Sequence, residues 1–180
     1  RSPRVVRITL GTALSLLMLM WLPALFSFGL GFTLLSQLLA LAVAAATGFI
    51  SAKKAAKPLM AVREPELRPY LCCVIPTVLL LCGLTLSHTL PHMPDGGLGS
   101  GQSTYGDMCM HLGIISSITR QGFFPPEYSI MAWQPMSYPF LCDSVSSTFY
   151  TLGASLRLSY ILPMIPAFFS VASGGYLFFE

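Results

Sequence analysis

The sequence predicts an all-α, polytopic membrane protein: four transmembrane helices, with amphipathic interfacial helices in a long external loop. Of the 180 residues, 54% are hydrophobic and only 9% are charged, and the mean hydropathy is +0.69. This composition is too apolar for a soluble domain of this length. No charged residue occurs from Ile8 to Ala52, a stretch long enough for two spans of about 20 residues each. A bilayer is therefore the expected solvent, and nucleic acid is not an expected partner.

The first two spans form a predicted helical hairpin. Ile8–Phe28 is rich in Leu and Met, and Thr33–Ile50 continues with small residues. Between them, the segment Phe28–Phe32 contains two glycines and offers a turn with interfacial aromatic side chains. A cleaved signal peptide is the competing interpretation, because arginines precede the apolar run. The run is too long for that, and a second span follows it at once.

The third and fourth spans are expected at about Tyr70–Ser87 and Leu158–Phe179. Both contain proline, which membrane helices tolerate when neighbouring groups satisfy the freed carbonyls. The chain then divides into an N-terminal hairpin with its basic segments, residues 1–69, and a pair of spans, residues 70–180, that encloses the loop 88–157.

Basic residues set the expected orientation, because Lys and Arg next to spans stay on the cytoplasmic side. Eight of the ten lie either before the first span or between the second and third. The N-terminus and segment 51–69 are therefore expected in the cytoplasm of a multi-pass cell-membrane protein. Loop 88–157 holds two arginines against four acidic residues and is expected outside. Those six are Arg120, Arg157, Asp95, Asp107, Glu127 and Asp143.

The external loop contains two predicted amphipathic helices. In residues 102–122, apolar side chains recur at helical spacing, so we expect a helix along the membrane surface. Thr104 and Asp107 resemble a capping box at its start, and Gly122 is placed to end it. After a Pro-Pro turn, a second run has Asp143 and Ser147 on one face. Its apolar face is formed by Leu141, Val145, Phe149 and Leu152.

Three segments of this loop carry a family resemblance. They are Tyr105-Gly-Asp-Met-Cys-Met-His-Leu-Gly-Ile-Ile, Phe124-Pro-Pro-Glu-Tyr and Met136-Ser-Tyr-Pro-Phe-Leu. They resemble the first external loop of GT-C superfamily membrane glycosyltransferases, and more closely a poorly characterised bacterial membrane-protein group within or near that superfamily. The resemblance covers about Pro91 to Pro163. It implies transfer of a sugar from a polyprenyl-phosphate carrier to an acceptor at the outer membrane face.

Carried over from the family, the catalytic acid matches Asp107. It would act as the general base, or as an electrostatic or metal-binding partner for the acceptor. A donor with a phosphate leaving group needs little acid help, whereas an acceptor hydroxyl needs a base, so one carboxylate can suffice. The structural alternative is an acid that stabilises the first turn of a helix through the macrodipole. The two roles can coexist.

Four further residues are candidates for binding substrate. His111 lies one helical turn after Asp107, so the two could share a divalent metal or a phosphate; an interfacial histidine is the equal alternative. Arg120 and Arg157 could meet the carrier phosphate, and Arg157 could instead be a snorkelling anchor. Glu127 is a second acid near the site, although an exposed turn carboxylate is the favoured interpretation.

The remaining polar residues of the loop are expected to have structural roles. Asp143 is expected to be a first-turn helix acid, and His88 and His92 are expected at the interface. The sequence leaves a disulfide between Cys109 and Cys142 open, with free thiols favoured.

The chain also departs from the family pattern. A hairpin precedes the span that leads to Asp107, and the paired acids of the family are absent, since Met108 follows Asp107. Family members have more spans and a second external loop, so we expect the N-terminal portion of a longer protein. Two alternatives to the enzyme stay open: a non-catalytic membrane scaffold whose loop binds a partner or lipid head groups, and a transporter component.

Overall fold

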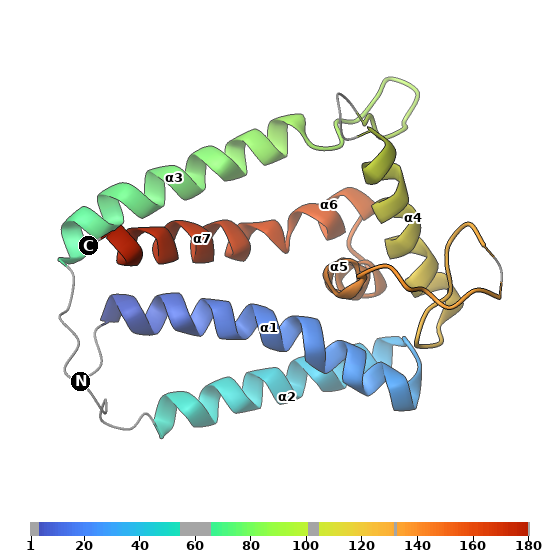
Figure 1. The fold of residues 1–180 in the computed structure, drawn as a ribbon, viewed down its shortest axis with the longest axis horizontal. Coiled ribbons are helices and arrows are strands. Elements are labelled where there is room, and N and C mark those ends of the chain that lie inside the picture. The colour runs from blue at the N-terminus through green and yellow to red at the C-terminus, as the bar shows by residue number, and fades with distance from the viewer. Residues whose placement is uncertain (1–3, 55–65, 101–104, 132, 180) are drawn as a thin grey trace.

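The structure is a computed structural model that describes residues 4–54, 66–100, 105–131 and 133–179 (Figure 1). This part of the chain is helical, and its β-pairing is limited to two isolated bridges. The all-α prediction is confirmed. The helices are α1 (Arg4–Leu30), α2 (Leu34–Lys53), α3 (Leu67–His88), α4 (Tyr105–Gln121), α5 (Leu141–Thr151), α6 (Leu156–Ile161) and α7 (Met164–Phe179).

Four segments are long and apolar enough to cross a membrane: α1, α2, α3, and α6 with α7 taken together as Leu156–Phe179. These are the four predicted spans, and their large apolar side chains are extensively exposed, as a lipid solvent requires. The fourth span is divided at Leu162-Pro163, where the proline ring and its missing N–H interrupt helical hydrogen bonding. The chain is a multi-pass helical membrane protein.

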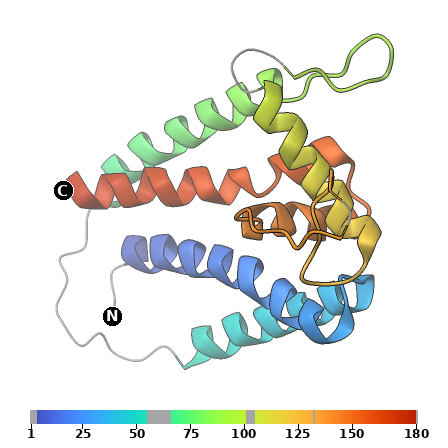
Figure 2. The same cartoon turned by 45° about the vertical axis from the view of Figure 1, so that its right-hand side comes forward.

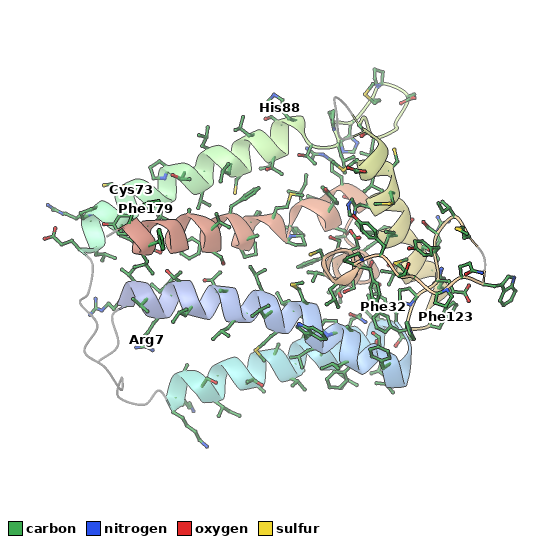
Figure 3. The ribbon with its side chains drawn as sticks, viewed as in Figure 1. Arg7, Phe32, Cys73, His88, Phe123 and Phe179 are labelled. Atoms are coloured by element: carbon green, nitrogen blue, oxygen red, sulfur yellow. The ribbon has the colours of Figure 1, made fainter. Side chains whose placement is uncertain are left out.

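The ends of the helices fall into two groups. The start of α1, the end of α2 and the start of α3 lie at one end of the bundle, and α4 and α5 lie across the other end (Figures 1 and 2). Figure 3 shows Arg7 at the first end, and Phe32 and Phe123 at the second. The described basic residues at these helix ends therefore flank the end opposite to the loop helices; which side is cytoplasmic stays a prediction.

The two predicted loop helices are present, and protein covers their apolar faces. Ile114, Ile115 and Ile118 of α4 are buried. Two of them join Phe32, from the hairpin turn, and Met136 in one hydrophobic cluster. The helix α5 lies between α4 and the transmembrane helices and packs on both (Figures 1 and 2). The loop is therefore an integral cap on the bundle.

A close backbone contact joins this cap to the hairpin. The N–H of Phe32 donates to the carbonyl of Gly122, at 2.8 Å. Gly122 has a φ of +69° and ends α4, as the sequence predicts. Gly31, with a φ of +68°, turns the chain between α1 and α2, and a Cβ there would lie 2.5 Å from the Gly122 oxygen. Only glycine fits this junction.

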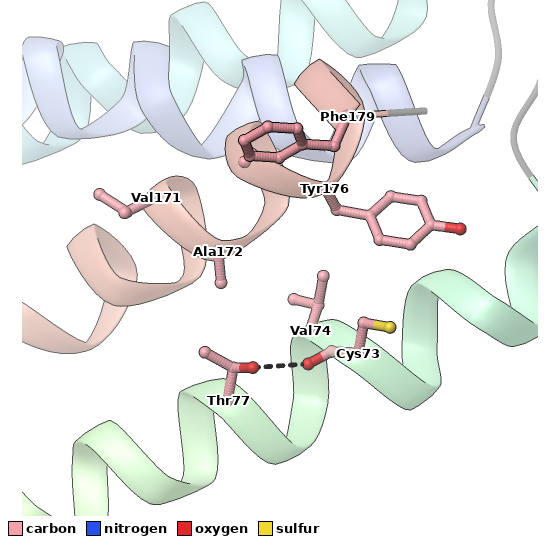
Figure 4. Close-up of a pocket in the computed structure, with 8 residues that line it drawn as sticks. Cys73, Val74, Thr77, Val171, Ala172, Tyr176 and Phe179 are labelled. Carbon is pink, nitrogen blue, oxygen red and sulfur yellow. Dashed lines mark hydrogen bonds between the residues drawn. The ribbon is translucent and has the colours of Figure 1, made fainter.

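At the opposite end, α3 packs on α7. The Tyr70 hydroxyl is hydrogen-bonded to that of Ser173, at 2.9 Å, inside a small hydrophobic cluster with Val5 and Val74. A groove between the two helices opens beside this contact (Figure 4). Its lining is mostly apolar and offers few groups for chemistry: Cys73, Val74, Thr77, Val171, Ala172, Gly175, Tyr176 and Phe179.

The glycine junction can be tested by substitution. Gly31→Ala should lower the stability of the purified protein by at least about 1–2 kcal/mol, because alanine resists the left-handed backbone and its Cβ meets the Gly122 carbonyl. Gly29→Ala is the matched control, since it lies inside α1 with open space around it and should preserve or slightly raise stability. Thermal unfolding in detergent measures both. Equal melting temperatures for the two variants would contradict the proposed junction.

Candidate functional site

A histidine and an aspartate from the two loop helices form a close pair. The Nδ1 atom of His111, on α4, lies 3.1 Å from Oδ1 and 3.0 Å from Oδ2 of Asp143, on α5. Asp143 is only 4% exposed, whereas 28% of the His111 side chain is accessible. The acid is thus enclosed by the protein, and the imidazole is the part of the pair that other molecules can reach.

The pair lies at one end of a cavity of about 310 Å³. Its polar end is formed by His111, Asp143, Ser146 and Tyr160. Its apolar walls come from α1, α5 and the fourth span: Leu16, Met20, Val145, Pro163, Met164 and Ala167, with Cys142 beside them. A cavity of this size, mostly apolar with a few polar groups converging at one end, has the usual character of a small-molecule site.

Burial sets the electrostatics of the pair. The desolvation of Asp143 raises the pKa of its carboxyl above the ordinary value of 3.8, and the hydrogen bond and charge of His111 act in the opposite direction. Among the described residues that line the cavity there is no Lys or Arg. His111 is therefore the group that stabilises a negative charge on Asp143.

The sequence-predicted catalytic acid lies outside this cavity. Asp107 is in the first turn of α4, as expected, and its side chain is exposed. The structure brings His111 together with Asp143 and leaves Asp107 one helical turn away, at the open start of the helix. Thr104, its predicted capping partner, lies outside the described residues.

The other predicted binding residues are dispersed. Arg120 is exposed and lines a separate groove of about 600 Å³ on α4, together with Ser116, Ser117 and Gln121. The Glu127 carboxylate accepts a hydrogen bond from the backbone N–H of Trp133, at 3.2 Å. Neither side chain lines the cavity that holds His111.

Arg157 has structural partners. Its guanidinium donates to the backbone carbonyls of Leu86, Thr89 and Leu90, at the end of α3. A cation at a helix C-terminus satisfies free carbonyls and complements the helix dipole. Arg157 therefore fastens the start of the fourth span to the end of the third, and its contact with a carrier phosphate stays a prediction.

The described part of the chain holds no group of three or more His, Cys, Asp or Glu side chains close enough to share a metal ion. Nδ1 of His111 is already engaged by Asp143. A divalent ion shared by Asp107 and His111 stays a prediction, and the chemistry below does not depend on it. Cys109 and Cys142 are both free and exposed.

The burial of Asp143 and its pairing with His111 are what the sequence interpretation missed. Asp143 does lie in the first turn of its helix, as expected. However, residues 143 to 148 of α5 are all buried, so this helix is surrounded rather than surface-lying. An acid in such a position requires a partner, and His111 supplies it. The signal in the sequence was the polar face that Asp143 shares with Ser147.

Comparison with known proteins leaves the function to be argued from this geometry. No protein-family model, no curated protein and no solved structure matches the chain.

The raised pKa of Asp143 predicts a pH-dependent stability. The folded state binds this proton more tightly than the unfolded chain does, so the contribution to stability is complete below about pH 3.8 and is lost as the pH rises through the raised pKa. In Asp143→Asn, the melting temperature should therefore fall less steeply than in the wild type as the pH rises through this range. Ser146→Ala, a buried neighbour that does not titrate, should keep the wild-type slope. An unaltered slope in Asp143→Asn would show that Asp143 is not the group responsible for this pH dependence.

Proposed function

We propose that this chain forms part of a membrane glycosyltransferase of the GT-C type, which transfers a sugar from a polyprenyl-phosphate carrier to an acceptor at the outer membrane face. The observation that supports the proposal best is the cavity between the fourth span and α1, closed at its polar end by His111 and Asp143. A polyprenyl-phosphate sugar has the same division into an apolar chain and a polar head.

The position of the cavity suits such a carrier. Its apolar walls come from α1, α5 and the fourth span, so a prenyl chain lying there would keep apolar contacts like those it has in lipid. Its polar end is formed by His111 of α4, Asp143 and Ser146 of α5 and Tyr160 of α6, and these groups could meet a carrier's phosphate and sugar. A volume of about 310 Å³ suits the polar head and its first prenyl unit, with the rest of the chain in lipid.

Asp107 is the proposed catalytic carboxylate of the transfer. Asp107 is exposed to an incoming acceptor. The helix that carries it, α4, is fixed by its buried face, which packs on α5 and the rest of the cap. The carboxylate would withdraw the proton of the acceptor hydroxyl or stabilise the charge that develops near it. A single acid is sufficient here, unlike in glycosidases, which place two carboxylates across the bond.

Substitution of the acid tests the proposal. Asp107→Asn should lower transfer by at least about 10²-fold, because a proton-transferring or charge-stabilising side chain contributes at least that much, with little change in melting temperature. Asp95→Asn is the matched control, an exposed acid of the same loop whose turn-forming oxygen asparagine retains. The measurement is release of polyprenyl phosphate from a radiolabelled polyprenyl-phosphate sugar in membranes that contain the full-length protein. Unchanged turnover in Asp107→Asn would contradict the proposal.

An alanine scan separates this enzyme from the scaffold alternative. A scaffold tolerates alanine at Asp107, His111 and Glu127; truncating the buried Ile115 would destabilise either kind of protein and does not discriminate between them. The enzyme, in contrast, loses turnover when the polar residues of this scan are replaced by alanine. A transporter component would instead give solute flux in reconstituted liposomes; against it, the described parts of the four spans carry no acidic or basic residue near their centres.

A further inference from the structure

We propose that His111 is a catalytic residue of this cavity, taking the proton of the acceptor hydroxyl on Nε2, and that Asp143 is its positioning residue. The inference rests on the proposed function and assigns the proton transfer within it. Asp107 then has the electrostatic role toward the acceptor that the sequence analysis left open.

The hydrogen bond to Asp143 selects one tautomer of the imidazole. Both carboxylate oxygens lie within 3.1 Å of Nδ1, so an N–H on that nitrogen points between two acceptors. An ionised carboxylate only accepts, so Nδ1 bears the proton of the neutral ring and Nε2 carries the lone pair. Among the described residues, Nε2 has no hydrogen-bond partner. A free proton acceptor is thus held at the polar end of the cavity.

Two further contacts repeat along the same pair of helices and fix this geometry. One turn beyond the His111–Asp143 pair, the Ser147 hydroxyl lies 3.1 Å from the carbonyl oxygen of Ile115 on α4 and 2.8 Å from that of Asp143 on its own helix, so its one proton is shared between the two helices. One turn further still, the hydroxyl of Thr151 donates to that of Thr119, at 3.4 Å. We call these three contacts the α4–α5 ladder. Each step advances four residues on both helices, so neighbouring residues on α4 and α5 hold the imidazole and the carboxylate in register.

An aromatic contact restricts the ring of His111 from another side. The Tyr138 ring lies edge-on to the imidazole, with centroids 5.9 Å apart. The carboxylate and the tyrosine together leave the ring little freedom to rotate. Such preorientation is what a general base needs, because a small misplacement of the reacting nitrogen costs much of the rate.

The proposed step is balanced in atoms and charge. The acceptor oxygen forms a bond to the anomeric carbon of the sugar while its proton passes to Nε2 of His111. The bond between that carbon and the phosphate oxygen breaks, and polyprenyl phosphate leaves with the electron pair. The imidazolium that results is stabilised by the Asp143 carboxylate and then returns its proton to water or to the departing phosphate.

The tautomer gives a test that does not depend on activity. In the ¹⁵N NMR spectrum of histidine-labelled protein in bilayers, wild-type His111 in its neutral form should show a protonated Nδ1 and an unprotonated Nε2. His111→Gln assigns the signal, and His92→Gln, on an exposed histidine of the same loop, should leave it in place. In Asp143→Asn the preference for this tautomer should fall, and Asp143→Glu should restore part of it. An Nε2-protonated ring in the wild type would overturn the proposal whatever the enzyme's activity.

The kinetic test uses the same variants with the radiolabelled polyprenyl-phosphate sugar. His111→Gln should lower kcat by about 10²- to 10⁴-fold while KM for the carrier stays within a few-fold, and Asp143→Glu should recover part of what Asp143→Asn loses. His92→Gln and Asp95→Asn should match the wild type. Normal kcat in His111→Gln would overturn this step and leave the proposed function standing. Absence of transfer by the wild type would overturn both.

Discussion

The packing of α4 against α5 is the interaction on which the cap and its cavity depend. The α4–α5 ladder joins the helices at His111–Asp143, Ile115–Ser147 and Thr119–Thr151, each step one turn beyond the last. Between the steps, Ile114 and Ile118 are buried on the neighbouring face of α4. A buried carboxylate is costly unless it is paired, so the register that pairs Asp143 with His111 is favoured over any shifted one.

The α4–α5 ladder can hold the His111–Asp143 pair in place only because the cap is itself fixed to the transmembrane bundle. The glycine junction holds the end of α4 against the hairpin turn. Gln37, fully buried in α2, accepts a hydrogen bond from Thr148 of α5 at 2.8 Å and donates to Ser27 of α1 at 3.0 Å. In lipid, such polar contacts have few competing partners, so they are efficient at fixing one arrangement. The cavity is thus walled by spans and cap together.

Much of this fold could be predicted from the sequence, because its strongest signals are local. Uninterrupted apolar runs located the spans, a helical period located α4 and α5, and Gly122 marked the end of α4. The pairing of His111 with Asp143 was not predicted, since it joins residues 32 positions apart and depends on how two helices pack. The role of Gly31 was hidden for the same reason: its close neighbour, Gly122, is remote in the chain. Periodicity shows which faces are polar, but not which faces meet.

The same distinction, between what is visible locally and what depends on packing, separates the two acids Asp107 and Asp143. An acid at the head of a helix is conspicuous in a sequence, and its exposure suits an encounter with substrate. However, an exposed side chain can adopt many orientations, whereas a paired one is held in one. Asp143 is inconspicuous among serines, yet it is buried against His111 and holds the imidazole in the orientation that the proposed proton transfer needs. Physical chemistry therefore favours proton transfer at the buried pair and charge stabilisation at the exposed acid.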